Sequence, residues 1–393
     1  MSISQNFPEE GPTLNLNFAG SKTLDPRITF SRTTTGTYMD DSGLIKVAPA
    51  DAPRFDHRYV NGEIESLGLL VEEERTNLVT DSNGGDYGYD MSSGGSPTND
   101  IAPDGSTVAC KYDLSSNTGS PFLNCNVDTT LTNGVTYTMS MWVKGTTEFT
   151  VALAFVGETN YTVTSRNMDV TTSWTRETYT FTLSGNQINS RLQVFFGTQG
   201  QGKIISIWGA QLEEGAFATS YIPRSAGSQS TREPDSVSMT GDNFSDWYNQ
   251  SEGSILWRGT IHSIPISGSR IFEVYNSSTP AERIAISVEN NELMYMRVRK
   301  TNDTATQTYN LGTVSLGSEY KIGLGVDGSS LCLAVNDEIK TTISDSFTLS
   351  SSDTLIFTDL KDLGGARKFT TRHTGLSYYP TRLTNAQLQT LTK

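Results

Sequence analysis

The sequence has 393 residues, more than one ordinary hydrophobic core accommodates, so we expect two or three domains. Its 43 acidic and 29 basic residues give a formal net charge of -14, which repels phosphate backbones and argues against a nucleic-acid partner. No run approaches the roughly 20 apolar residues that span a bilayer, and the first residues lack the features of a signal peptide, so we expect a soluble protein without membrane insertion.

Short runs of β-branched and aromatic residues recur along the whole chain, separated by Gly, Ser, Thr and Asn. In residues 135–143, 177–183 and 255–261, large side chains alternate with polar ones. This alternation predicts strands that bury one face, and many such short strands are typical of antiparallel β-sandwiches. We therefore predict an all-β fold.

Loop-rich stretches at 81–90 and 224–235 separate these runs into three parts. We predict a small N-terminal β segment at 1–80, followed by tandem antiparallel sandwiches at 81–226 and 227–393.

The first part is too small to form an independent core, and its apolar residues 67–71 need a neighbour to bury them. We expect it to pack against another part or to contribute strands to one. Its arginines suit fixed contacts with carboxylates, either on another protein or within the same segment. These arginines are Arg27, Arg32, Arg54, Arg58 and Arg75.

Two features of the third part define local structure. The run Gly323–Gly328 fits a dinucleotide-binding glycine motif, but residues 320–326 alternate as a strand and Asp327-Gly328 suits a hairpin turn, so nucleotide binding is rejected. Residues 242–250 are expected to be helical. A second short helix is expected after Thr384, which forms a capping-box pattern with Gln387.

No arrangement of reactive side chains predicts catalysis. His57, His262 and His373 lie far apart and are expected on the surface or in turns. Acidic neighbours at 72–74 and 213–214 point to opposite faces of a strand, so they do not form a glycosidase pair. We predict no enzyme and no catalytic residues. The scattered cysteines Cys110, Cys125 and Cys332 are expected as buried apolar residues.

Blocks within residues 24–73, such as LDPRITFSR at 24–32, resemble the opening of many phage structural and tail-fibre-like proteins. The block GAQLEEGAFATSYIP at 209–223 is the most specific motif, and with its surroundings it looks like a carbohydrate-binding module of jelly-roll type. Residues 253–383 resemble a laminin-G or concanavalin-like sandwich.

The likeness to a carbohydrate-binding module directs attention to residues that contact sugars. Such a site needs a flat aromatic face against the apolar side of a sugar ring, with amides beside it for the hydroxyls. The competing role is core filling, which we expect of Trp142, Trp174, Trp208 and Phe181. Our glycan-binding candidates are Phe155, Tyr161, Phe195 and Gln199.

The resemblance implies a structural component of a bacteriophage virion. We expect an external appendage, either a tail fibre or spike or a head fibre that decorates the capsid, made in the host cytoplasm. Residues 1–80 are expected to face the particle. The partners would be other virion proteins and further copies of this chain, most simply as a trimer. Adhesion to a host surface glycan is an additional expected role. A dedicated receptor-binding lectin and a capsule depolymerase or glycoside hydrolase remain as alternatives.

Sandwiches of these families often bind calcium through loop oxygens, which makes the oxygen-rich loops of this chain relevant. They occur at 81–90 and near Asp104, Asp113 and Asp128, but none has the spacing of a known calcium loop. We expect no cofactor and leave calcium as an open alternative.

Overall fold

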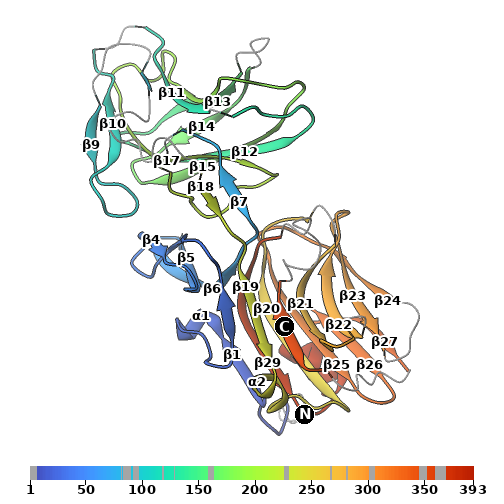
Figure 1. The fold of residues 1–393 in the computed structure, drawn as a ribbon. Coiled ribbons are helices and arrows are strands. Elements are labelled where there is room, and N and C mark those ends of the chain that lie inside the picture. The colour runs from blue at the N-terminus through green and yellow to red at the C-terminus, as the bar shows by residue number, and fades with distance from the viewer. Residues whose placement is uncertain are drawn as a thin grey trace.

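The structure is a computed structural model of the chain. It describes residues 7–80, 82, 90–91, 97–116, 119–127, 129–157, 163–224, 230–265, 268–279, 282–300, 306–344, 352–358 and 369–393. Among these residues every strand pairing is antiparallel, and the strands form two β-sandwiches, which confirms the predicted fold class (Figure 1). No helix in the described ranges has the length and hydropathy that a membrane span requires.

The larger sandwich is formed by two sheets that enclose one apolar core. In spatial order its first sheet contains β27 (Glu338–Ile343), β26 (Leu331–Val335), β25 (Glu319–Val326), β20 (Gly253–Ile261), β29 (Thr371–Tyr379), β6 (Glu63–Val71) and β5 (Arg54–Val60), and β1 (Leu14–Asn17) also pairs with β29. Its second sheet contains β2 (Thr29–Ser31), β19 (Ser236–Thr240), β28 (Thr354–Phe357), β21 (Ser269–Tyr275), β22 (Arg283–Val288), β23 (Leu293–Arg299) and β24 (Gln307–Thr313).

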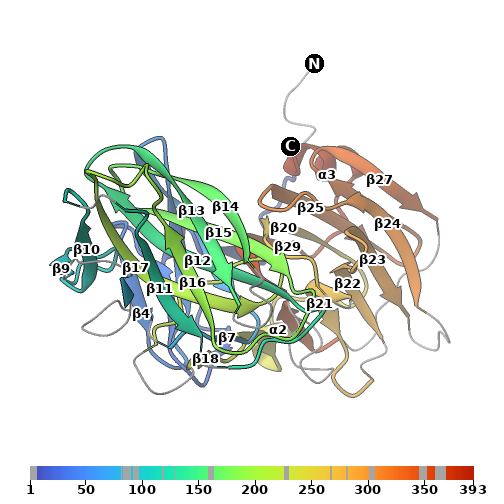
Figure 2. The same ribbon diagram turned by 90° about the horizontal axis from the view of Figure 1, so that it is seen from above.

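The smaller sandwich has a separate core and two five-stranded sheets. One sheet contains β15 (Thr175–Thr182), β12 (Thr136–Gly145), β17 (Ile204–Glu214), β10 (Ala109–Asp113) and β9 (Thr98–Asp100). The other contains β14 (Val163–Val170), β13 (Phe149–Val156), β16 (Ser190–Phe195), β11 (Phe122–Val127) and β8 (Asp90–Met91). Seen from above, the two sandwiches lie side by side (Figure 2).

The N-terminal segment contributes strands to both sheets of the larger sandwich. β1, β5 and β6 extend its first sheet and β2 joins its second, so that Phe18, Leu69 and Val71 belong to its core. This segment therefore has no core of its own: most of its buried apolar residues pack with strands from the C-terminal part of the chain, and Ile45 packs with residues of the smaller sandwich. The hairpin of β3 (Gly36–Met39) and β4 (Ile45–Ala48) projects from it.

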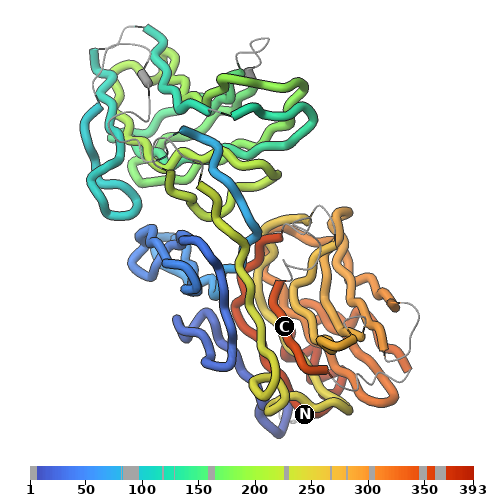
Figure 3. The backbone as a smooth tube through the Cα atoms, viewed as in Figure 1, coloured from blue at the N-terminus to red at the C-terminus, as the bar shows by residue number. Residues whose placement is uncertain are grey.

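The smaller sandwich is an insertion in the larger one. The chain leaves the larger sandwich after β6 and returns to it at β19. The two connections pair as a short ribbon, β7 (Arg75–Asn77) with β18 (Ser230–Arg232), which is visible as two tubes running together between the sandwiches (Figure 3). The sequence predicted two sandwiches that follow each other along the chain. In the structure the smaller sandwich is instead inserted between strands β6 and β19 of the larger one.

The structure confirms two of the local predictions and corrects a third. Gly323 to Val326 lie in β25 and pair with β26 across the turn at 327–330, which confirms the hairpin. The helix α3 (Asn385–Leu391) carries the predicted capping box of Thr384 and Gln387. The helix expected at 242–250 is wrong in length, because α2 ends after one turn (Asp242–Ser245). The chain then bends so that aromatic rings of 244–248 pack on Tyr378. A four-residue helix, α1 (Phe18–Ser21), was not predicted.

Candidate functional site

The outward face of the β14-β13-β16-β11 sheet carries a band of amide side chains. In β11, β13 and β16 alternate side chains enter the core of the smaller sandwich, so the intervening ones face outward. The strand registers place them in two adjacent rows. We call these residues the amide face: Asn124, Gln193 and Ala154 in one row, and Phe122, Phe195, Ala152 and Asn167 in the other.

Two amides of this face bind each other. The Gln193 side chain donates from Nε2 to Oδ1 of Asn124 at 3.0 Å, across the pairing of β11 with β16. Each amide group can make more than one hydrogen bond, so the pair is oriented and still has donors and acceptors for a ligand. Two polar groups held in a fixed orientation on rigid strands bind with less loss of side-chain entropy than two mobile ones.

An open groove of about 880 Å³ lies over the second row of this face, where Phe195, Ala152 and Asn167 line it. Gln193 and Asn124, in the adjacent row, are not among its lining residues. Phe195 borders it with 38% of its surface exposed. Ala152 lies between Phe195 and Asn167 in the register, and its single methyl group leaves a low floor between two longer side chains. Gln199 lines the groove beyond the end of β16 and is exposed. The groove thus offers an apolar ring face bordered by amides and hydroxyls.

The four predicted glycan-binding residues have different positions. Phe195 and Gln199 lie together in the groove. Phe155 is not available to a ligand, because it is fully buried in the core and its ring stacks on Phe181 with 4.7 Å between centroids. Its place in β13 puts it on the inward side, since neighbours Ala154 and Val156 occupy the outward positions. Tyr161 lies outside the described residues.

Sequence reasoning missed most of the amide face. Asn124 and Gln193 alternate with apolar residues in their strands, so their outward orientation was predictable. The pairing of β11 with β16 joins segments that are distant in the sequence, and no short-range pattern indicates it.

The block at 209–223, the most specific motif in the sequence, fastens a loop to the outer side of β17. Gln211 Oε1 accepts from the Ile222 amide at 2.7 Å, and Glu213 accepts from both the amide and the hydroxyl of Thr219. Gly215 has a φ of +135° and lies against the Arg75 guanidinium, where a side chain has no room. The motif therefore shapes the contact between the two sandwiches.

A buried group of charges joins this loop to the larger sandwich. Glu72 forms ion pairs with Arg54 at 2.6 Å and Arg232 at 3.1 Å, and accepts hydrogen bonds from the amide and hydroxyl of Ser220. Asp235 pairs with Arg32 and Arg54. We call these six residues the junction network. Burial raises the pKa of Glu72, but the charges of Arg232 and Arg54 outweigh that effect and hold it well below its ordinary value.

The arginines of the N-terminal segment therefore pair within the chain. Arg27 binds Asp25, Arg58 binds Glu65 and Arg75 binds Glu73, in addition to the network contacts of Arg32 and Arg54. Of the two roles open from the sequence, intramolecular pairing is the one the structure confirms.

The histidines are more buried than expected: His57 and His373 are buried within strands, and His262 lies half-buried just after β20. His373 is fully buried in β29, where Nδ1 accepts from Trp257 Nε1 at 2.9 Å, and burial lowers its pKa to about 3. His262 is half-buried and its Nε2 lies 2.5 Å from Arg372. Burial, followed by the charge of Arg372, lowers the pKa of His262 to about 3. His57 is also buried and bonds the Met39 carbonyl.

Predicted structural roles hold for several other residues. Cys110, Cys125 and Cys332 are buried, as expected. Trp142, Trp208 and Phe181 are buried, whereas Trp174 is only partly buried.

The structure describes some of the loops that the sequence suggested as calcium sites. Asp104 and Asp113 accept hydrogen bonds from Ser106 and Ser115 two residues on, which stabilises turns. Asp128 and nearly all of 81–90 lie outside the described residues. Within the described ranges no three His, Cys, Asp or Glu side chains converge.

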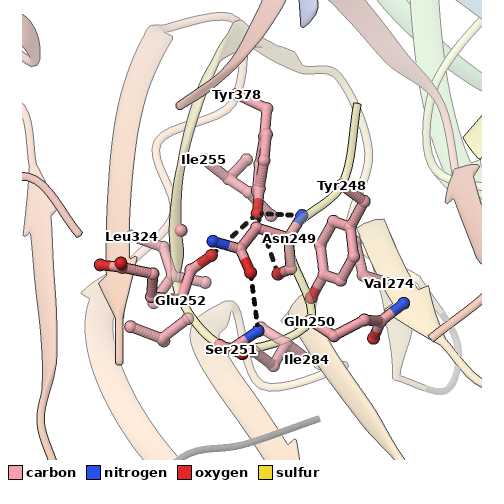
Figure 4. A pocket seen from close by; sticks show the side chains of 12 residues that line it. Tyr248, Asn249, Gln250, Ser251, Glu252, Ile255, Val274, Ile284, Leu324 and Tyr378 are labelled. Carbon is pink, nitrogen blue, oxygen red and sulfur yellow. Dashed lines mark hydrogen bonds between the residues drawn. The ribbon is translucent and has the colours of Figure 1, made fainter. Parts of the chain in front are cut away.

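One further cavity lies at the end of the larger sandwich, among Tyr248, Glu252 and Tyr378 (Figure 4). Its volume is about 10 Å³, room for about one water molecule. The Tyr378 hydroxyl fills the centre, accepting from the Asn249 amide and bonding the carbonyls of Asn249 and Glu252. This cavity is part of the packing and does not admit a ligand.

Comparison with known proteins gives one match to a family model. Residues 112–201 match the model described as "Carbohydrate binding domain". The match spans strands β11 to β16 and includes every amide-face position. It covers a minority of the chain. No curated protein matches this sequence.

Several solved structures resemble part of this chain. The Ruminococcus gnavus IT-sialidase CBM40 bound to α2,3-sialyllactose aligns at 14% identity with a TM-score of 0.31, covering 37% of this chain and 84% of that one. The leech intramolecular trans-sialidase aligns at 18% identity with a TM-score of 0.31, over 37% of this chain and 23% of that one. The receptor-binding domain of botulinum neurotoxin type G aligns at 10% identity, TM-score 0.31, over 40% and 39%. At these scores the alignments carry no argument about ligands.

Proposed function

We propose that this protein binds carbohydrate through the amide face and serves, without enzymatic activity, in an external appendage of a bacteriophage particle. The observation that carries the binding proposal is the groove beside Phe195, within the segment that matches a carbohydrate-binding family model. The phage assignment rests on the sequence likeness of residues 24–73 to the opening of phage structural and tail-fibre-like proteins.

The physical case for a sugar is the combination of side chains. A pyranose ring has an apolar face that packs on an aromatic ring, and hydroxyls at its rim that need donors and acceptors. Phe195 supplies the ring, and Asn167 and Gln199 supply amides within the groove that can act as both donor and acceptor. The bonded pair Gln193 and Asn124 lies in the adjacent row of the amide face. An aromatic side chain exposed beside amides also favours a dedicated receptor-binding lectin, whose host contact would be this same face.

The case against catalysis rests on the acidic residues. Glu72 and Glu213, which stand at the two acidic blocks of the sequence, are buried and engaged by arginines or Thr219. A glycosidase needs two carboxyl groups about 5 Å or 6.5–9.5 Å apart across a cleft that admits the substrate. We propose that the protein holds glycans and does not cleave them.

The experiment that tests the binding proposal is a glycan array followed by titration calorimetry on the best ligand. Phe195→Ala should weaken binding at least tenfold, whereas Leu316→Ala should leave it unchanged. Leu316 is the matched control because it is also an exposed apolar side chain but lies in the larger sandwich. Equal affinity of wild type and Phe195→Ala would reject the amide face. The virion role has a separate test, which is labelling of the intact particle with an antibody to this chain.

A further inference from the structure

A second cleft lies between the two sandwiches. Its volume is about 640 Å³, within the range of pockets that hold small ligands. One wall is the outer face of β12 and β15 with the loop 216–221, and the other is formed by β3, β5 and residues of the larger sandwich such as Arg372. It lies on the sheet of the smaller sandwich opposite the amide face, so the two surfaces are independent.

Arg176 stands out among the charged groups of this cleft. Arg372 pairs with Asp56 at 2.6 Å and Arg58 pairs with Glu65 at 2.9 Å. Arg176 instead donates to the Thr219 carbonyl at 2.7 Å and to the Ser140 hydroxyl at 3.0 Å. Within the described part of the chain no carboxylate forms an ion pair with it, and Glu213 and Glu72 act on it only from a distance. Its positive charge is therefore not neutralised by a direct contact.

The position of Arg176 suits it to receive an anion. Its guanidinium stacks on the Trp142 ring, 4.4 Å from the centroid, which fixes its plane without using its charge for an ion pair. Two of its nitrogens are held by neutral acceptors. Burial lowers its pKa, opposed by the charges of Glu213 and Glu72. An arginine in a partly desolvated site gains most from a carboxylate, because charge-assisted hydrogen bonds are the strong ones.

The rest of the lining suits a saccharide. Tyr59, which is 57% exposed, and the partly buried Trp174 both line the cleft, so aromatic surface is available for sugar rings. Thr178 and Thr180 present exposed hydroxyl-bearing side chains from β15, on the same face as Arg176. The net charge of -14 disfavours a polyphosphate occupant, whereas a single carboxylate meets one local positive charge.

We propose that this cleft is a second carbohydrate site, selective for acidic saccharides, in which Arg176 binds a carboxylate. That the occupant is a saccharide rests on the proposed function of the smaller sandwich, but the site is distinct from the amide face. The protein then has one surface for neutral sugar units and another for acidic ones.

The test uses the full chain and matched ligands. The probes are two trisaccharides that each carry a single uronic acid unit, galacturonate in one and glucuronate in the other. Each is compared with the neutral trisaccharide of the same linkage, which has a hydroxymethyl group in place of the carboxylate. Binding is measured by titration calorimetry and by tryptophan emission, because Trp142 and Trp174 line the cleft. At least one acidic probe should bind tenfold or more tighter than its neutral counterpart, and added salt should reduce the difference.

Three variants locate the binding. Arg176→Met keeps a stem to pack on Trp142 and should abolish the preference for the acidic probe. Thr178→Trp blocks the cleft from an exposed position and should weaken acidic-probe binding at least tenfold, so the test survives misfolding of Arg176→Met. Phe195→Ala should leave it unchanged. No binding of either acidic probe at millimolar concentration, unchanged binding in Thr178→Trp, or loss in Phe195→Ala alone overturns the proposal. Failure of the amide-face test with this result intact would reject only the proposed primary site.

Discussion

Replacing Asp235 by Asn should destabilise the larger sandwich by about 3–5 kcal/mol, the usual effect of removing one partner from a buried ion pair. Asp235 accepts from Arg32 at 2.9 Å, from Arg54 at 2.6 Å and from the Glu72 amide at 2.9 Å. The side chains of Asp235 and both arginines are fully buried, so solvent does not screen the loss. Asn has nearly the same shape but leaves two buried guanidinium groups short of a negative charge.

The assay is thermal unfolding by calorimetry and urea titration. At about 2–4 °C per kcal/mol for a domain of this size, the melting temperature of the larger sandwich should fall by roughly 6–20 °C. Asp113→Asn is the matched control, because Asp113 only stabilises an exposed turn, and it should leave the melting temperature essentially unchanged. A loss below about 1 kcal/mol for Asp235→Asn would refute the view that its charge is needed to hold the buried arginines.

Three further outcomes follow from the fold. A chain that begins at Asp81 should lose the cooperative unfolding transition of the larger sandwich, since it lacks β1, β5 and β6. A truncated chain that still shows one transition for each sandwich contradicts this. The wild type should be more stable than Glu72→Gln by an amount that is constant above the ordinary glutamate pKa of 4.5. This difference should decline as the pH falls below 4.5, because the pKa of Glu72 is lower in the folded state than in the unfolded state. Urea titrations of both proteins between pH 3 and 7 check the sign. Thr384→Ala should cost about 1 kcal/mol by removing the capping box with Gln387, and an unchanged urea midpoint argues against that contribution.

Alternation of side chains made the strands predictable. In β25 and β26 the alternation and the turn residues agree, and the hairpin forms as expected. The capping box at Thr384 is similarly local. The helix predicted after Gly241 was too long because the aromatic spacing there suits a helix. In the structure Trp247 and Tyr248 reach the core from a bend after α2. Tertiary packing there overrides the local pattern.

Long-range pairing was beyond the reach of such patterns. The insertion of the smaller sandwich depends on β6 pairing with β29, which lies near the opposite end of the chain. Phe155 and Phe195 have similar surroundings in the sequence, yet they occupy opposite faces of one sheet, because Phe155 pairs with Leu192 and Phe195 pairs with Ala152. Alternation within β16 places Phe195 on the outward face with Gln193, but the near-continuous apolar run of β13 leaves the orientation of Phe155 open until its register with β16 is known.

The most direct measurement of the central claim is a crystal structure of the protein with its best-binding glycan. We predict a sugar ring packed on Phe195, with its hydroxyls bonded to the amides of Asn167 or Gln199. A glycan bound on another surface, with the groove beside Ala152 unoccupied, would contradict the assignment of the amide face.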